Sequence, residues 1–374
     1  MNSRRVDCLA FAVENDERHF MLVSNSEILE LIQMKAWTSI SEEARQMFEK
    51  VLASSRTRQL CRIDLGSLLD DDHESRYRRY RKLMIDATRS CVDRLAAKSV
   101  IGMDKIALVI TTSTVLSICP PLSSIIVNQL KLAPSTLTLD LSHMGCAGLL
   151  WAVELAGRLL QPGKAAFILG AELTSAMSDL HGRQDALLAA SVFGDGVAGL
   201  VVARPPHVHD SILQFRQFSG SLLCSDKALE CIYYDAGPVF PQIHLSESIS
   251  EIAGEGIRLA LRPLIEDRYV TFSEKLLYLI KRRDPRWQSK VDYFVVHTAG
   301  TKILANLQKE LHSDYRQFSH NSKSFDVYGN TSSTSVLYSL NELIGSRSLH
   351  SGEQLLFLTY GSGFMTKAAS ATVS

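Results

Sequence analysis

The sequence predicts an α/β protein made of two similar halves, residues 1–204 and 205–374. In both halves, short apolar runs of strand length alternate with longer segments of helical periodicity. The 374 residues are enough for two domains or one large double domain. Hydrophobic residues make up 46% of the chain and charged residues 21%, which is typical of a globular protein with a substantial core.

The first half contains four predicted strands and several helices. Apolar residues at helical spacing predict helices over 27–34, 41–52, 83–98, 122–132 and 147–160. Short apolar runs predict strands over 105–111, 135–141, 165–171 and 199–203. The run KIALVIT at 105–111 is almost free of polar residues, which indicates a strand that is covered on both faces.

The second half repeats this alternation after a stretch, 205–241, for which we expect irregular structure. Helical spacing predicts helices over 245–261, 301–311 and 333–344. Strands are expected over 291–296, 354–360 and 365–373, the last two around a glycine turn.

Charge and cysteine usage exclude several classes of function. Forty basic and forty acidic residues cancel, so no nucleic-acid partner is expected. No apolar run approaches the ~18–20 residues that cross a bilayer, so we expect no membrane span. The first residues lack the apolar stretch of a signal peptide, and seven scattered cysteines indicate reduced thiols in the cytoplasm. The cysteines and histidines lack zinc-site spacing, so no metal is predicted.

Cys146 is the first candidate catalytic residue. It lies in HMGCAG at 143–148, after a predicted strand and at the start of an apolar helix. The positive end of a helix dipole favours a thiolate, and neighbouring glycines allow close approach of the backbone. A buried structural cysteine is the alternative interpretation of this motif taken alone.

His297 and Asn330 complete the candidate set. His297 follows the apolar strand VDYFVV and precedes a turn of small residues. A cysteine with a sequence-distant histidine is the pattern of an activated thiol nucleophile. Asn330 lies in GNTSS at 329–333, which alone is also typical of a turn and a helix cap.

One glycine motif is interpreted as structural. GDGVAG at 194–199 fits the dinucleotide-binding pattern G-x-G-x-x-G, but that pattern requires a helix after it. Here an apolar strand follows, so the sequence does not predict a nucleotide site.

Together these segments resemble the thiolase superfamily, in particular its ketoacyl synthase III, type III polyketide synthase and fatty-acid elongase group. The likeness runs from about residue 82 to 372 and rests on five motifs in order, which are listed here: HMGCAG at 143–148, SVFGDGVAG at 191–199, VHTAG at 296–300, GNTSS at 329–333 and GSGF at 361–364. The resemblance implies a five-layered αβαβα fold of two pseudo-symmetric halves, and a homodimer.

The resemblance also implies a role for each residue. Cys146 would carry the acyl group, and His297 and Asn330 would stabilise an enolate. The amides of Cys146 and Ser362 would form the oxyanion hole. Arg58 and Arg62 would bind coenzyme A phosphates, although this part of the chain is weakly matched.

The sequence therefore predicts a ketosynthase that condenses an acyl thioester with a malonyl or β-ketoacyl thioester, with coenzyme A or acyl carrier protein as donor and no permanently bound cofactor. The loop 111–121 contains no glutamate, which relatives that condense head to head without decarboxylation, or that form pyrones, often use as a base. Those reactions stay as alternatives, as do acyl transfer to an alcohol or amine and a non-catalytic role in a heterodimer.

Overall fold

The computed structural model describes residues 5–35, 57–70, 72–178, 189–207, 210–235, 241–246, 248–266 and 287–374, with 41–42, 45–46 and 49. The predicted helix over 41–52 lies largely outside these residues. The strands are β1 (Val6–Glu14), β2 (Phe20–Ser24), β3 (Thr57–Cys61), β4 (Ile106–Ser113), β5 (Leu137–Ser142), β6 (Ala165–Glu172), β7 (Gly196–Ala203), β8 (Leu213–Leu222), β9 (Ile232–Asp235), β10 (Gln242–Leu245), β11 (Tyr293–Val296), β12 (Gln354–Gly361) and β13 (Met365–Val373).

Nine of these strands form one sheet, and its two parts share a four-strand pattern, to which β5 adds an edge strand in one part. The strand order is β11–β12–β13–β8–β1–β7–β6–β4–β5. In one part, β4 is parallel to β6, which is antiparallel to β7, and β7 is antiparallel to β1. In the other part, β11, β12, β13 and β8 repeat this pattern. The two parts meet where β1 pairs with β8 over three residue pairs.

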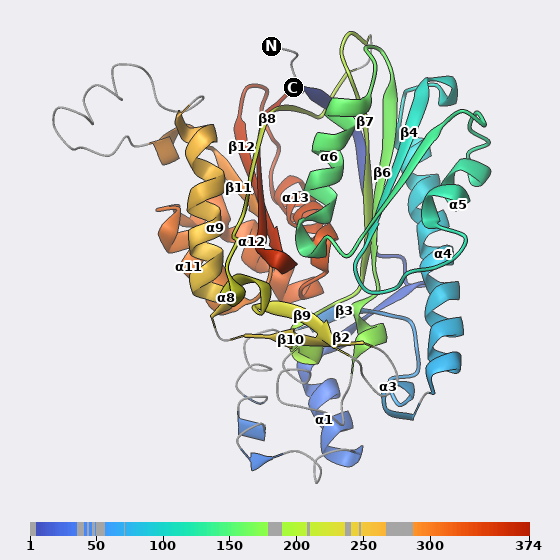
Figure 1. The fold of residues 1–374 in the computed structure, drawn as a ribbon, viewed down its shortest axis with the longest axis vertical. Helices are drawn as coiled ribbons and strands as arrows, with labels where there is room; N and C mark the ends of the chain where they lie inside the picture. Colours follow the sequence, from blue (N-terminus) through green and yellow to red (C-terminus); the bar gives the residue numbers. More distant parts are fainter. Residues whose placement is uncertain are drawn as a thin grey trace, which may run out of the picture.

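The helices form layers on both faces of this sheet. They are α1 (Asn25–Lys35), α3 (Ser67–Asp70), α4 (His73–Lys98), α5 (Leu122–Gln129), α6 (Gly148–Leu159), α8 (Asp226–Leu229), α9 (Ile249–Leu264), α11 (Thr301–Glu310), α12 (Tyr315–Tyr328) and α13 (Ser335–Ser346). Figure 1 shows α4 and α5 on one side, α9 and α11 on the other, and α6 and α13 between them.

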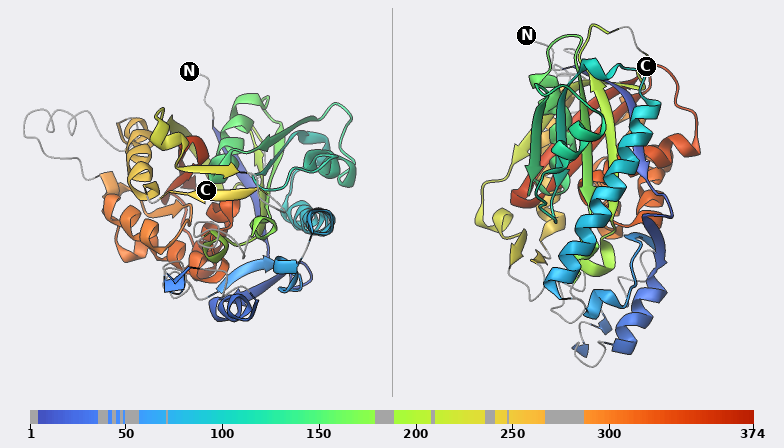
Figure 2. Two further views of the ribbon diagram at one scale, coloured as in Figure 1. Left: turned by 60° about the horizontal axis from the view of Figure 1, so that its bottom comes forward. Right: turned by 90° about the vertical axis from the view of Figure 1, so that its right-hand side faces the viewer.

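Three apolar cores hold these layers together. The central core joins α6 and α13 to strands of both sheet parts. A second core packs α4 and α5 on the first part of the sheet, and a third packs α9, α11 and α12 on the second. The side view in Figure 2 shows the long α4 running along its face of the sheet. The five-layered α/β fold of two similar halves is confirmed.

Local sequence explains the helix boundaries. Asp72 caps the start of α4 by accepting a hydrogen bond from the Ser75 amide. Burial of Tyr80, Met84 and Leu95 then fixes the face of α4 that contacts the sheet. In the structure, α4 begins ten residues before the predicted start at 83. The prediction missed this first stretch because charged residues occupy its exposed face.

Several elements differ from the sequence-based prediction. No strand was predicted before residue 105, yet β1 lies in the middle of the sheet, buried along its whole length. The stretch 205–241 was expected to be irregular, yet it contains β8, β9 and α8. No helix was predicted over α12, where polar residues obscure the apolar spacing. Its capping box, Asp314 with Gln317, is the signal that could have located it.

The division of the chain into halves after residue 204 stays a prediction; that position falls between β7 and β8. The rejected dinucleotide motif lies where β7 begins, so a strand follows its first glycines, as expected. In the part of the chain that the structure describes, none of the helices combines the length and the apolar character needed to span a bilayer.

Candidate active site

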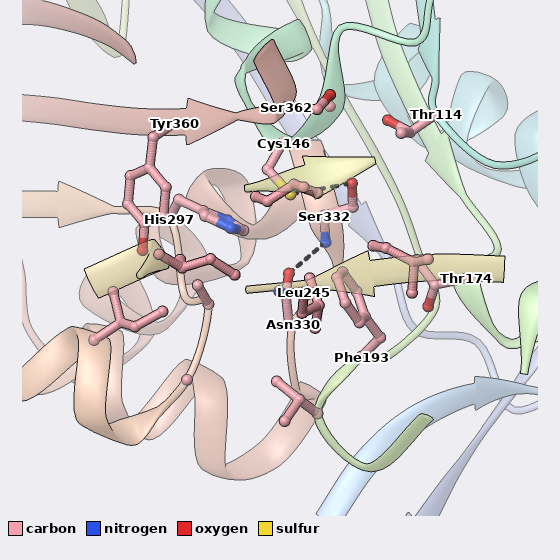
Figure 3. Close-up of a pocket in the computed structure, with 18 of the residues that line it drawn as sticks. Thr114, Cys146, Thr174, Phe193, Leu245, His297, Asn330, Ser332, Tyr360 and Ser362 are labelled. Atoms are coloured by element: carbon pink, nitrogen blue, oxygen red, sulfur yellow. Dashed lines mark hydrogen bonds between the residues drawn. The ribbon is translucent and has the colours of Figure 1, made fainter. Parts of the chain in front are cut away.

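A cavity of about 570 Å³ lies at the carboxyl ends of the parallel strands, where the two halves meet. Both halves contribute to its lining: Cys146 comes from the first half, and His297 and Asn330 come from the second. Apolar side chains form much of the rest, among them those of Val115, Met177, Phe193, Ile232, Ile243 and Leu245. Figure 3 shows the sulfur, the imidazole and the carboxamide arranged around this space.

Cys146 lies in a single 3₁₀ turn, Gly145–Ala147, between β5 and α6. Its Sγ is 3.6 Å from Ser332 Oγ, a hydroxyl of the second half. Cys146 is partly exposed, and it lines the cavity. The structure therefore places Cys146 where we predicted it, after a strand and before an apolar helix.

Glycines allow the Cys146 turn to approach the loop after β12. Gly145 has a φ of +57°, and a Cβ added there would lie 2.7 Å from the backbone nitrogen of Ser362. A Cβ on Gly361 would lie 2.8 Å from the backbone nitrogen of Cys146. The amides of Cys146 and Ser362, which we predicted as an oxyanion hole, thus belong to two loops in direct contact, and both residues line the cavity.

The ionisation of Cys146 differs from what the helix position suggested. Burial, opposed by the hydrogen bond to the Ser332 hydroxyl and reinforced by nearby Glu172, raises the pKa of the thiol to about 12. The thiol of Cys146 is therefore neutral at pH 7.

His297 follows β11 and is almost completely buried, at 1% exposure. Its backbone N–H donates to Leu358 O, which anchors it to β12. Its Nδ1 is 2.6 Å from Ser335 Oγ, so Nε2 is the ring nitrogen that remains for a substrate. Burial lowers the pKa of His297 to about 3, and the imidazole is neutral at pH 7.

Asn330 is held by the glycine-rich segment of the first half. Its N–H donates to Val192 O, and its carbonyl accepts from Gly194 N. In the side chain, Oδ1 accepts a hydrogen bond from Ser332 N at 2.9 Å. Because Oδ1 is occupied in this way, Nδ2 is the group that can donate into the cavity.

Arg58 and Arg62 do not line the cavity. Arg58 is 1% exposed, and its guanidinium donates to Ala190 O and Asn25 Oδ1. A phosphate cannot reach a group enclosed in this way, so the structure does not support the predicted coenzyme A contact at Arg58. Arg62 is exposed and donates to Glu17 O, and its predicted role stays a prediction.

The sequence analysis overlooked Glu172, a fully buried carboxylate at the end of β6. It accepts hydrogen bonds from the N–H and hydroxyl of Thr114 and from the Ser333 hydroxyl. Burial raises its pKa to about 7. A lone glutamate that ends the apolar run AAFILGAE was the signal in the sequence. Glu172 does not itself line the cavity, since Thr114 separates the two.

Among the described residues that line the cavity there is no aspartate or glutamate. Across the described chain, no cluster of three or more His, Cys, Asp and Glu side chains is placed to hold a metal ion. The described lining offers a thiol, a neutral imidazole and a carboxamide, together with several hydroxyls and the ammonium of Lys302.

Comparison with known proteins agrees with this arrangement. The family described as FAE1/Type III polyketide synthase-like protein matches residues 3–284. The C-terminal region of 3-oxoacyl-[acyl-carrier-protein] synthase III matches residues 286–373. Similar proteins include the probable 3-ketoacyl-CoA synthase 21 of Arabidopsis thaliana, which is 24% identical over 74% of this chain and 64% of its own length. The 3-ketoacyl-CoA synthase 6 of the same plant is 26% identical over 76% of this chain and 62% of its own length.

Solved structures show the same fold. The type III polyketide synthase domain of Steely1 from Dictyostelium has a TM-score of 0.81 at 18% identity, covering 99% of both chains. The 1,3,6,8-tetrahydroxynaphthalene synthase of Streptomyces coelicolor has a TM-score of 0.79 at 20% identity, covering 100% of this chain and 99% of its own. This chain spans less than two thirds of the length of the first curated relatives it matches. It belongs to the FAE1/type III polyketide synthase-like family.

Proposed function

We propose that this chain is a ketosynthase that carries an acyl group on Cys146 and condenses it with a malonyl thioester, releasing carbon dioxide. The observation that carries this proposal is the shared cavity of Cys146, His297 and Asn330. Its curated relatives are named 3-ketoacyl-CoA synthases, and its structural neighbours include type III polyketide synthases.

In the first step, the Cys146 thiol attacks the carbonyl of an acyl thioester. The neutral imidazole of His297 takes the thiol proton and passes it to the departing thiolate of the donor. Ser335 can stabilise the His297 ring whether or not Nδ1 carries a proton. Its hydroxyl accepts a hydrogen bond from a protonated Nδ1 and donates one to an unprotonated Nδ1. The amides of Cys146 and Ser362 hold the oxyanion of the tetrahedral intermediate.

In the second step, the malonyl thioester loses carbon dioxide and forms an enolate. Asn330 Nδ2 donates a hydrogen bond to the thioester oxygen. His297 donates a second one from Nε2, which carries the ring proton when the Ser335 hydroxyl donates to Nδ1. These hydrogen bonds strengthen as negative charge develops on that oxygen. The enolate carbon then attacks the acyl carbonyl, and the carbon–sulfur bond to Cys146 breaks. The released thiolate takes up a proton from water, which restores the neutral thiol, and the β-ketoacyl thioester leaves.

The described cavity lining favours decarboxylation over deprotonation. A carboxylate that removes an α-proton would have to face the substrate, and the described lining contains none. Loss of carbon dioxide forms the same enolate without a base. The apolar wall of Met177, Phe193, Ile243 and Leu245 suits a hydrocarbon acyl group.

Coenzyme A is the donor that we propose, rather than acyl carrier protein. The curated relatives are named for CoA thioesters, and one structural neighbour, CsyB, was solved with CoA-SH. That neighbour has a TM-score of 0.82 at 16% identity, covering 99% of this chain and 100% of its own.

A homodimer is part of the proposal, with β5 at the contact. β5 is an edge strand of the nine-stranded sheet, and it is poorly covered. Leu137 on this strand is 49% exposed, and Leu159 on α6 is 46% exposed. An exposed apolar edge strand favours pairing with another strand. A Leu137→Glu variant should run as a monomer in size-exclusion chromatography with light scattering, whereas wild type runs as a dimer.

Intact mass spectrometry tests the central proposal. Purified wild type is incubated with a series of acyl-CoA donors, and its mass is compared with that of Cys146→Ala and Cys224→Ala. We expect one acyl adduct on wild type and on Cys224→Ala, which removes an exposed thiol, and none on Cys146→Ala. Addition of malonyl-CoA should then release the adduct as a β-ketoacyl product.

Each alternative predicts another result. Release of the adduct by an alcohol or amine, without any β-ketoacyl product, would identify an acyltransferase. The absence of an adduct with every donor would indicate a non-catalytic partner chain and would refute the proposal.

A further inference from the structure

Tyr360, at the end of β12, carries a buried hydroxyl that no described residue binds. The residue is 2% exposed. Among the described residues that line the cavity, its Oη is the only buried side-chain polar atom without a hydrogen-bond partner. The ring packs edge-on against His297, with centroids 5.0 Å apart, and stacks on Phe364 at 6.0 Å. A phenylalanine would make the same ring contacts, so packing does not account for the hydroxyl.

A buried hydroxyl without a partner destabilises a folded protein, because its hydrogen bonds to water are lost and not replaced. The hydroxyl of Tyr360 is also held in its protonated form, since burial raises its pKa well above the ordinary value. It is therefore a hydrogen-bond donor at neutral pH, and it needs an acceptor that enters from the cavity.

The surroundings of Tyr360 favour an acceptor with negative charge. The ring belongs to the apolar core formed with α9 and α11. The first residues of α11, Thr301 and Lys302, line the same cavity. The start of a ten-residue helix and a lysine ammonium both favour an anion, and no described carboxylate in the lining opposes one.

We propose that Tyr360 is a further substrate-binding residue whose hydroxyl donates a hydrogen bond to the free carboxylate of the malonyl group. This rests on the proposed function, in which His297 and Asn330 bind the malonyl thioester oxygen. The Tyr360 ring packs on His297 (Figure 3). The carboxylate carbon of a malonyl group is two bonds from its thioester carbonyl carbon, so a malonyl thioester bound at His297 would hold its carboxylate near this ring.

The proposed role is consistent with the chemistry of decarboxylation. The bond between the α-carbon and the carboxylate breaks, and its electron pair moves into the enolate, whose oxygen is held by His297 and Asn330. Neutral carbon dioxide leaves, and Tyr360 keeps its proton throughout. Because the carboxylate loses charge as the bond breaks, the hydrogen bond from Tyr360 contributes more to binding than to the rate of this step.

Equilibrium binding tests the proposal without turnover. In a Cys146→Ala background, which cannot be acylated, Tyr360→Phe should raise the Kd for malonyl-CoA about 10- to 100-fold by isothermal titration calorimetry, the range for a lost bond to a charged acceptor. The Kd for acetyl-CoA, which lacks the carboxylate, should stay unchanged. With Cys146 intact, Tyr360→Phe should raise KM for malonyl-CoA and leave kcat close to wild type.

Tyr233→Phe is the matched control, because it removes an exposed hydroxyl from β9, a strand that also lines the cavity. It should change neither Kd. The melting temperature of ligand-free Tyr360→Phe should equal or exceed that of wild type, since no structural hydrogen bond is lost.

Three results would overturn the proposal. An unchanged Kd for malonyl-CoA would show that the hydroxyl binds no part of the substrate. An equal loss for acetyl-CoA would assign the hydroxyl to the pantetheine arm rather than to the carboxylate. If the Cys146→Ala protein binds neither thioester, the proposed function fails, and the role of Tyr360 fails with it.

Discussion

The turns that open α6 and α13 are built alike, yet they present different chemistry. Each is one 3₁₀ turn followed by a twelve-residue helix in the central layer. Each contains a residue with positive φ, Gly145 at 57° and Ser332 at 52°. The first turn carries Cys146, whose sulfur lies at the cavity. The second turn follows Asn330 and orients its side-chain amide through the hydrogen bond from Ser332 N to Asn330 Oδ1.

The two turns are stabilised in different ways. At Gly145 the absence of a side chain is required, because a Cβ would meet the Ser362 backbone. At Ser332 a side chain is present, and the positive φ is held by the hydrogen bond from its N–H to Asn330 Oδ1. A repeated backbone unit thus carries the proposed nucleophile in one half and the proposed hydrogen-bond donors in the other, so substitutions in the two turns should have separable effects.

The largest expected effect is the separation of the two half-reactions. Asn330→Ala should acylate Cys146 at close to the wild-type rate but lower condensation roughly 10²–10³-fold, because it removes a donor to the enolate oxygen. Intact mass measures acylation, and β-ketoacyl product measures condensation. Cys146→Ala should abolish both. If Asn330→Ala lost acylation as completely as Cys146→Ala, the division of roles between the turns would be wrong.

The next effect concerns the backbone of the first turn. Gly145→Ala should lower the free energy of unfolding by about 1–3 kcal/mol and slow acylation, because alanine disfavours positive φ and its Cβ would displace Ser362. Urea denaturation measures the change. Gly345→Ala, in α13 with open space around it, is the control and should stabilise the protein by up to ~1 kcal/mol. Equal stability of Gly145→Ala and wild type would contradict the requirement for glycine.

Glu172, whose hydrogen-bond partner Ser333 lies in the second turn, should make stability depend on pH. Its folded pKa is raised from 4.5 to about 7, so the folded protein keeps a proton that the unfolded chain releases. Stability should therefore fall as pH rises from about 4.5 to about 7, by at most ~3 kcal/mol. The Glu172→Gln variant should not show this fall in stability with rising pH, because glutamine does not titrate.

Urea denaturation at pH 5 and pH 8 measures the difference, with the exposed Glu30→Gln as control. Because ionised Glu172 raises the pKa of Cys146, the Gln variant should also show faster iodoacetamide alkylation at pH 8. A wild-type pH profile in Glu172→Gln would refute this account.

The smallest expected effect lies away from both turns, in the choice of acyl group. Tyr234 on β9 lines the cavity, whereas its neighbour Tyr233 is 43% exposed. Tyr234→Ala should enlarge the cavity and shift preference toward longer acyl-CoA donors, roughly fourfold in kcat/KM for each methylene accommodated. Tyr233→Ala should leave the chain-length profile unchanged. An identical shift in both variants would point to a distortion of β9 rather than to cavity size.

The candidate site could be located from the sequence to a large extent. His297 stands directly after the apolar strand β11 and Cys146 shortly after β5, and the carboxyl ends of parallel strands in an α/β sheet lie at one edge. The order of the motifs indicated the fold. The strands β1 and β8 were missed, because β8 carries polar residues along much of its length and owes its strand conformation to pairing with β13.

What the sequence alone determined was the set of residue types and their local settings: glycines where the backbone must be close, and a thiol, an imidazole and an amide at the ends of elements. Only the tertiary structure decided the state of those groups. Burial raises the pKa of the Cys146 thiol, Arg58 is enclosed by its neighbours, and the Tyr360 hydroxyl has no hydrogen-bond partner among the described residues. Exclusion of water depends on neighbours from distant parts of the chain, and local sequence does not encode it.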